Sequence, residues 1–222
     1  MQNVIVAPDF DQRSPAPSDD VSVRVHRPGD AGRRNVEWFI NAAYARAFAG
    51  RIRDHYPTLI SIQDAEGRIL AAAGIRLARE ETLFLEQYLD LAVEAAVGRA
   101  FDLDVDRAQV AEIGNLASSD REASRRLFLA LARHLELEGC AYAAATATRP
   151  LRQCFCRGGL QVRSLAKADA AKLNAGVDDW GSYYACDPEV VAGPVASCIP
   201  RLAAKAEASR TAGAPALGHA SL

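Results

Sequence analysis

A single carboxylate stands inside an apolar run near the middle of the chain. Glu112 lies within the strand-like residues 110–116, and the turn Ser118-Ser119-Asp120 follows before a helical pattern begins. The first N–H groups of a helix lack helical partners and the helix dipole is positive there, so such a turn favours an anion. A desolvated carboxylate has a raised pKa and can act as a general base. The stretch therefore indicates an active site in which an acid lies beside an anion-binding turn.

Each of these features also has a structural explanation. Glu112 could form an ion pair with Arg76 across the sheet and serve stability alone. Ser119 and Glu122 form a capping-box pattern, which any stable helix can show. Asn115 could serve only to satisfy backbone groups at a β-bulge. The pattern leaves the catalytic and the structural roles open.

Composition and charge exclude several classes of protein. The chain has 222 residues and a formal net charge of −2, which gives no general attraction to nucleic acid or to anionic membranes. No stretch approaches the roughly 20 apolar residues that span a bilayer, and no secretory signal is evident. Five irregularly spaced cysteines argue against a disulfide framework, and Cys154-Phe-Cys156 lacks a second ligand pair for zinc. We therefore expect a cytoplasmic protein without a metal or a nucleic-acid partner.

Hydrophobic periodicity predicts the elements that must position these residues. Strands are expected at residues 21–27, 58–64, 69–77, 110–116, 142–148, 161–165 and 180–184. Helices are expected from residue 33 onward and at residues 91–98, 119–139, 150–157 and 166–173. The first helix is expected to bury one face, formed by Trp38, Ala42, Ala45, Ala49 and Ile52. Residues 83–89 fit both periods.

This order of elements indicates a mixed α/β (α+β) fold with a mostly antiparallel sheet, parallel around the middle, and helices on both faces. It matches the architecture of the GCN5-related N-acetyltransferases (GNAT). One domain is expected over residues 21–200. Residues 1–20 and the Ala/Ser-rich residues 201–222 lack periodicity and are expected to be disordered tails.

Three blocks of sequence suggest a family. Val110-Ala-Glu-Ile-Gly-Asn-Leu-Ala, then Thr146-Ala-Thr with Leu151-Arg152, then Trp180-Gly-Ser-Tyr-Tyr with Val191-Ala-Gly resemble the thermostable haemolysin family of bacterial proteins. The resemblance covers roughly residues 48–193. A more distant similarity links Ala73-Gly-Ile-Arg-Leu and Glu112 to the acyl-homoserine-lactone synthases, which have a GNAT-like fold. Asn115 stands where those enzymes carry an arginine, and Ser118-Ser119-Asp120 replaces the usual Gly-rich phosphate loop of GNAT proteins.

The GNAT-like resemblance implies a separate catalytic role for each of several residues. The N–H groups of Leu116 and Ala117 would polarise a thioester carbonyl, while Glu112 takes the proton of an attacking amine. The phenol of Tyr183 or Tyr184 would protonate the leaving thiolate, although such aromatic residues more often pack a sheet.

The same resemblance implies two binding regions. The expected acceptor-binding residues are Arg76, whose guanidinium could hold a carboxylate or phosphate in two-point contact, Asn115 and Trp180. The donor's phosphates are expected near Ser118, Ser119 and Arg152.

Two classes of function follow. The first is an N-acyltransferase that takes an acyl group from acyl-CoA or a phosphopantetheine-linked acyl carrier protein, with no permanently bound cofactor, and passes it to a small amine or amino acid. The alternative, which the family name suggests, is a membrane-active cytolysin without catalysis. The sequence has no basic amphipathic helix of the kind that engages lipid, which favours the acyltransferase. The sequence leaves the oligomeric state open.

Overall fold

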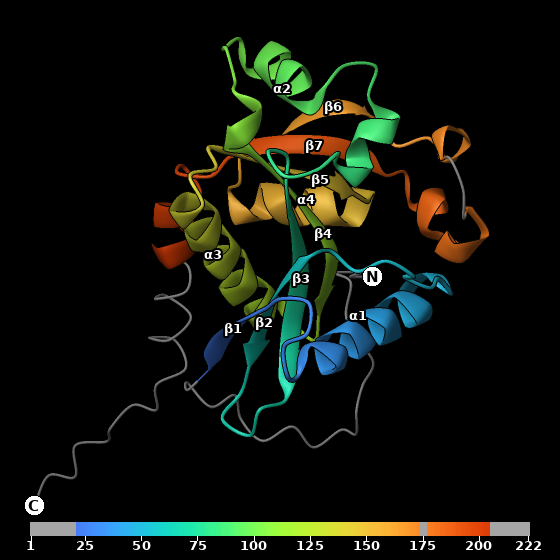
Figure 1. Ribbon diagram of the computed structural model, residues 1–222, viewed down its shortest axis with the longest axis vertical. Coiled ribbons are helices and arrows are strands. Elements are labelled where there is room, and N and C mark those ends of the chain that lie inside the picture. Colours follow the sequence, from blue (N-terminus) through green and yellow to red (C-terminus); the bar gives the residue numbers. More distant parts are fainter. Residues whose placement is uncertain (1–20, 174–176, 205–222) are drawn as a thin grey trace, which may run out of the picture.

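The computed structural model describes residues 21–173 and 177–204 and has a mixed sheet at its centre (Figure 1). Within these residues seven strands are ordered β1-β2-β3-β4-β5-β7-β6. Their bounds are Ser22–His26 (β1), Thr58–Gln63 (β2), Ile69–Leu77 (β3), Val110–Ser118 (β4), Tyr142–Ala147 (β5), Arg163–Lys167 (β6) and Glu189–Pro194 (β7). The β4–β5 pair is parallel and the other neighbouring strands are antiparallel. The predicted fold class is confirmed, including the position of the parallel pair.

Helices cover both faces of this sheet. The α-helices are Arg33–Phe48 (α1), Val93–Phe101 (α2), Arg121–Leu137 (α3) and Arg149–Gly158 (α4). The short 3-10 helices are Phe84–Tyr88 (η1), Arg107–Gln109 (η2), Ala170–Lys172 (η3), Val177–Trp180 (η4) and Tyr183–Cys186 (η5). Successive residues of a strand point to opposite faces, so Leu59 packs in the cluster of α1 while Ile60 packs in that of α3. Residues 83–89, which fitted both periods, contain η1.

The centre of the sheet is opened by an irregularity in β4. In the β3–β4 register Gly74 faces Gly114 and Ala72 faces Ala117, so β4 carries one extra residue between these pairs. Asn115 occupies this bulge with a positive φ of 51°, and its Oδ1 accepts a hydrogen bond from the Tyr56 backbone N–H at 3.1 Å. Asn115 therefore lies in a bulge and satisfies a backbone group there, as the structural alternative expected.

Beyond Glu112 the strands β4 and β5 separate. Their parallel pairing covers only Val110, Ala111 and Glu112 of β4, opposite Tyr142 to Ala144. Strand β5 continues to Ala147 against β7, while β4 continues to Ser118 against β3. The two central strands pair only at their N-terminal ends and then diverge, which leaves a gap in the sheet. Side chains of α3, α4 and η5 border this gap.

The prediction of an aromatic strand at residues 180–184 is wrong. Trp180 ends η4, residues 181–182 form a turn and Tyr183 begins η5. This backbone is bound by the end of α1 and the residues just after it, and not by a neighbouring strand. Ser182 N–H donates to the Phe48 carbonyl at 2.8 Å, and Arg51 N–H donates to the Asp179 carbonyl at 2.6 Å. Gly181 takes a positive φ of 52° at this contact. The last strand in sequence is β7, which the periodicity did not predict.

The buried face predicted for α1 is also wrong. Trp38 is 62% exposed, whereas the buried residues include Val36, Ile40, Tyr44 and Phe48. These large side chains recur every four residues and outweigh the alanines, which fit any face of a helix.

At the other end of the chain, Leu202 is buried in the core, so ordered structure runs past residue 200, where a tail was expected. Residues 1–20 and 205–222 lie outside the described residues.

The start of α3 is displaced by one residue from the prediction. The N-cap is Asp120, whose Oδ1 accepts a hydrogen bond from the Ala123 N–H at 2.8 Å. The predicted cap, Ser119, donates its hydroxyl to Asp120 Oδ2 at 2.8 Å instead. A carboxylate serves this position well because it also faces the positive end of the helix dipole.

This assignment predicts a difference between two neighbouring alanine variants. Asp120→Ala should lower the free energy of unfolding by about 1 kcal/mol, since it removes the N-cap. Ser119→Ala should change it by less than about 0.5 kcal/mol, because the Ser119 side chain accepts no helix N–H. Urea denaturation of both variants measures the difference. Equal losses in the two variants would contradict Asp120 as the cap.

Candidate active site

The Glu112 carboxylate is buried against η1 and is held by three donors. Its Oε1 accepts hydrogen bonds from the Tyr56 hydroxyl at 2.7 Å and the Leu85 N–H at 3.1 Å, and its Oε2 accepts one from the Phe84 N–H at 2.8 Å. Only 1% of the residue is exposed. Burial raises the pKa of Glu112 to about 7, although the Tyr56 hydrogen bond and the charge of Arg76 oppose this shift. An acid with this pKa can accept a proton near neutral pH.

The helix η1, which supplies two of these donors, is fixed by its own charged network. Glu86 accepts the N–H groups of Leu83 at 2.8 Å and Val93 at 3.1 Å. It also binds the Arg107 guanidinium through two hydrogen bonds of 2.7 Å and 2.8 Å. The Arg107 hydrogen bond is the main reason that the pKa of Glu86 is lowered to about 2. The network holds the first turn of η1 in place, so its N–H groups stay directed at Glu112.

Arg76 lies opposite Glu112 in the β3–β4 register, but it does not form the direct ion pair that the sequence allowed. Its guanidinium lies over the Tyr56 ring, with Cζ 4.5 Å from the ring centroid. Among the described residues its ion-pair partner is Glu81, whose Oε1 is 3.4 Å from Nε. That contact lacks hydrogen-bond geometry, and the buried Nε has no hydrogen-bond partner in the described part of the chain. Arg76 therefore keeps a donor that an anionic group could use.

Tyr56 has no counterpart among the residues predicted from the sequence. Its ring fills the space left by two glycines, because a Cβ atom built on Gly74 would lie 2.6 Å from Tyr56 Cβ and one on Gly114 would lie 2.5 Å from Tyr56 Cζ. The Tyr56 carbonyl accepts a hydrogen bond from Arg33 Nη2 at 2.8 Å. Burial, first, and the charge of Glu112 raise the pKa of Tyr56 well above its usual value. The available sequence signal was the pair of glycines inside two predicted strands.

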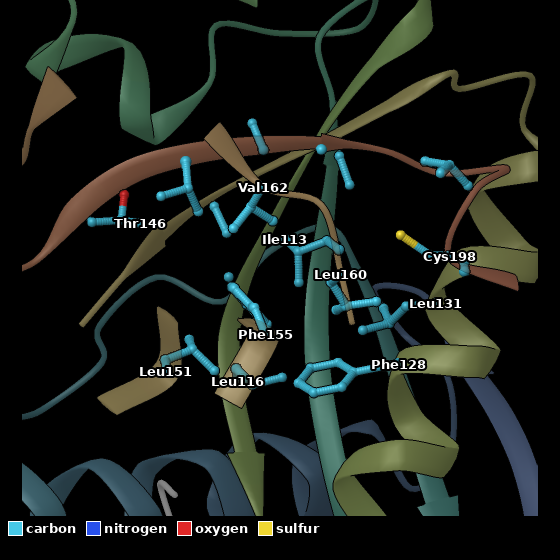
Figure 2. Close-up of a pocket in the computed structure, with 18 of the residues that line it drawn as sticks. Ile113, Leu116, Phe128, Leu131, Thr146, Leu151, Phe155, Leu160, Val162 and Cys198 are labelled. Carbon is cyan, nitrogen blue, oxygen red and sulfur yellow. The ribbon is translucent and has the colours of Figure 1, made fainter. Parts of the chain in front are cut away.

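An apolar cavity of about 110 Å³ lies where β4 and β5 separate (Figure 2). Strands β4, β5 and β7 and helices α3 and α4 all contribute to its wall. Large side chains in the wall include Ile113, Leu116, Phe128, Leu151, Phe155 and Leu160. Of the lining residues that the structure describes, none carries a charge. Such a lining can hold an alkyl or acyl chain.

The three aromatic candidates occupy different environments. Tyr183 lines the cavity, and its hydroxyl donates to the Thr146 carbonyl at 2.9 Å. Tyr184 is outside the lining and shares a hydrogen bond of 2.5 Å with the Tyr88 hydroxyl. Trp180 packs against the Phe84 ring, with centroids 5.6 Å apart. Of these three candidates, Tyr183 is therefore the one that lines the cavity.

Several groups predicted to bind the donor already have partners within the protein. Ser118 Oγ donates to the Asp120 carbonyl at 2.8 Å, and the Ser119 N–H donates to the Leu70 carbonyl at 2.8 Å. The backbone of Leu116 hydrogen-bonds the Tyr44 hydroxyl, which also lines the cavity. The Ala117 residue pairs with β3. The turn before α3 thus holds the Asp120 carboxylate as its own anion.

Arg152 is engaged in a similar way. Its guanidinium donates to the Ala147 carbonyl at 2.9 Å and the Asp187 carbonyl at 2.6 Å. It also forms ion pairs with Asp187 at 3.1 Å and Glu189 at 2.9 Å. These contacts tie the end of β5 to the start of β7 beside the cavity.

Neither a metal cluster nor a membrane span is found in residues 21–173 and 177–204. No three His, Cys, Asp or Glu side chains there gather closely enough to hold an ion. No helix in these ranges has the length and apolar character needed to cross a bilayer.

The fold is GNAT-like, as comparison with solved structures shows. The chain is similar to LasI, described as an AHL synthase (TM-score 0.54, 12% identity, 80% of this chain and 91% of that one). It is also similar to apo TofI (TM-score 0.53, 16% identity, 82% and 96%). A third is FeeM, an N-acyl amino acid synthase from uncultured soil microbes (TM-score 0.51, 11% identity, 86% and 97%). At these identities the likeness establishes the fold.

The family is established by sequence. The profile described as Thermostable hemolysin matches residues 26–199. The protein belongs to this family, which confirms the resemblance found in the three sequence blocks. A search of curated proteins gave no match.

The raised pKa of Glu112 predicts how stability depends on pH. Between the usual value of 4.5 and the folded-state value of about 7, the folded protein binds more protons at this site than the unfolded chain. The contribution of Glu112 to the free energy of unfolding should therefore fall as pH rises through this window.

The measurement is urea denaturation of wild type and Glu112→Gln at closely spaced pH values. The difference between them, wild type minus variant, should decrease across the window and level off above it. The subtraction cancels the histidines that titrate in the same range. A flat difference would contradict a raised pKa for Glu112.

Proposed function

We propose that this protein is an N-acyltransferase that moves an acyl group from an acyl-CoA or acyl-carrier-protein thioester to a small amine or amino acid. The observation that carries the proposal is the charge-free cavity between β4 and β5, beside a buried carboxylate with a pKa of about 7. Gly114 belongs to the cavity wall and is covered by Tyr56, which binds Glu112. The activities named for LasI and FeeM agree with this reaction class.

In this proposal the acyl chain of the donor fills the cavity. The thioester carbonyl then lies against β4, where the Tyr44 hydroxyl can polarise it. The N–H groups of Leu116 and Ala117 would join it by exchanging their present partners, the Tyr44 oxygen and β3, for the carbonyl. The carrier, CoA or phosphopantetheine, arrives with the acyl group and leaves as a thiol, so no resident cofactor is needed. Its phosphates would reach the region of Ser118, Ser119 and Arg152, which lie at the start of α3 and in the first turn of α4. Because acyl-CoA and acyl carrier protein are cytoplasmic acyl donors, the proposal also assigns this protein to the cytoplasm.

The bond changes follow from these positions. The amine nitrogen attacks the carbonyl carbon and forms the C–N bond, and its proton passes toward Glu112. The C–S bond breaks, and the thiolate takes a proton from Tyr183, which lines the cavity. The products are an N-acyl amide and a free thiol. Tyr184 acts at most through Tyr88 and Tyr183, because it lies outside the cavity lining.

Arg76 would hold the acceptor. A carboxylate on the acceptor could bind the guanidinium and displace Glu81, whose side chain is 39% exposed. Because this guanidinium lies over the Tyr56 ring, an α-amino group on the same molecule would come near the phenol and Glu112. Trp180 and Asn115 would shape the surrounding wall. These positions favour an amino acid among the possible acceptors.

The base role predicts a specific loss of turnover. Glu112→Gln should reduce kcat by about 10²- to 10⁴-fold, the range of a lost general base, while leaving the far-UV circular dichroism spectrum unchanged. A thiol reporter assay that crosses acyl-CoAs and acyl carrier proteins of several chain lengths with a panel of amino acids and amines measures turnover.

The same assay separates the two function classes. Thiol release that depends on the acceptor, with an N-acyl product seen by mass spectrometry, supports the acyltransferase. Lysis of red cells by the purified protein, with no thioester consumed by any pair, would favour the cytolysin suggested by the family name.

The cavity predicts that chain length can be changed by one substitution. Ala145 lines the cavity, so Ala145→Phe should fill part of it and shift the preferred donor to a shorter acyl chain. The matched control is Ala95→Phe on the exposed side of α2, which should leave the preference unaltered. The ratio of kcat/KM for long and short donors gives the result. An unchanged ratio in Ala145→Phe would place the acyl chain elsewhere.

A further inference from the structure

The Glu112 carboxylate is not among the groups that border the cavity. The lining includes its neighbours Ile113 and Gly114, but the carboxylate faces Tyr56 and the N–H groups of η1. A substrate amine could touch the carboxylate directly only by displacing one of these donors. A base that is enclosed in this way needs an intermediate group to receive a proton from substrate.

Tyr56 is hydrogen-bonded to Glu112 and packs against Gly114 from behind the cavity wall, without lining the cavity itself. Its hydroxyl is 2.7 Å from Glu112 Oε1. The same hydroxyl would lie 2.6 Å from a Cβ atom built on Gly114, a residue that lines the cavity. The other two donors to Glu112 are backbone amides, which cannot pass on a proton at this pH. The phenol is therefore the one partner of Glu112, among those described, that can both accept and donate a proton.

We propose that Tyr56 is a catalytic residue that relays the proton of the attacking amine to Glu112. The inference rests on the proposed function. As the C–N bond forms, the amine proton moves to Tyr56 Oη while the phenolic proton moves to Glu112 Oε1. Tyr56 ends neutral, Glu112 ends as a carboxylic acid, and the acyl carbon then expels the thiolate. Glu112 then returns its proton to solvent by the reverse path, and Tyr183, which protonated the thiolate, regains a proton from solvent.

The surroundings of Tyr56 suit a group that passes a proton on and not one that stays deprotonated as a base. Burial and the neighbouring carboxylate raise the pKa of Tyr56, so the phenol remains protonated until its proton can move in concert. Its position is fixed from three sides: Asn115 Oδ1 accepts its N–H, Arg33 binds its carbonyl, and the Arg76 guanidinium lies on its ring. The glycines at positions 74 and 114 leave the space that this position requires.

The test is Tyr56→Phe, which keeps the ring and removes only the hydroxyl. We expect kcat to fall by about 10²-fold or more, with the KM for the acyl donor changed less than roughly two-fold. We expect Glu112 to make kcat of the wild type rise with pH near neutrality, and in Tyr56→Phe this rise should move or disappear. The control is Tyr142→Phe, a buried phenol in β5 that packs against Phe101 outside this cluster, and it should keep the wild-type rate and pH profile.

A proton inventory on the wild-type protein tests the relay without a variant. Rates in mixtures of H₂O and D₂O should give a curved dependence, because two protons move in one step. If Tyr56→Phe does not fold, this measurement decides alone. A linear inventory, or a Tyr56→Phe variant with the wild-type rate and pH profile, would overturn the relay while leaving acyl transfer intact. Wild-type protein that consumes no thioester with any acceptor would instead overturn the proposed function, and the relay with it.

Discussion

The burial of one carboxylate determines how the centre of this protein is built. An ionised carboxylate without partners is too costly to bury, by several kcal/mol or more, so Glu112 requires donors from the chain around it. The connection before β2 provides the Tyr56 hydroxyl, and the segment after β3 provides the first N–H groups of η1. These two connections are thereby fixed over the same face of the sheet. The Glu86–Arg107 pair and the Arg33 contact then hold the donors themselves.

A second constraint follows from the position of Glu112 at the last shared pair of β4 and β5. The bulge at Asn115 lengthens β4 immediately after this point, and the two strands part. The gap between them becomes the apolar cavity, while Glu112 stays on the side covered by η1. The apolar cavity and the buried carboxylate therefore arise from the same stretch of β4, since the lining residues Ile113 and Gly114 directly follow Glu112. This arrangement links the irregularity of the sheet to the chemistry proposed for it.

The sequence predicted much of the frame, for reasons that the structure makes clear. Residues 69–77 and 110–116 are long and apolar, so β3 and most of β4 were predicted, and Glu112 stood out as the charge in that run. Tyr56 could not be predicted, because its importance comes from the paired glycines of two strands that are distant in sequence. The residues 180–184 were mistaken for a strand because aromatic content favours strands, whereas contact with the end of α1 decides their conformation. Likewise, Ser119 matched a capping box, but the neighbouring Asp120 competes better for the helix start.

The central claim is that an acyl thioester lies in the opening between β4 and β5 with its carbonyl against β4. The most direct measurement is a crystal structure with a non-cleavable thioether analogue of a medium-chain acyl-CoA. The account predicts an acyl chain among Leu116, Phe128 and Phe155, with the carbonyl-equivalent carbon near Gly114 and the Tyr56 hydroxyl. An analogue bound at another surface, or a cavity that stays empty at a saturating concentration of the analogue, would contradict it.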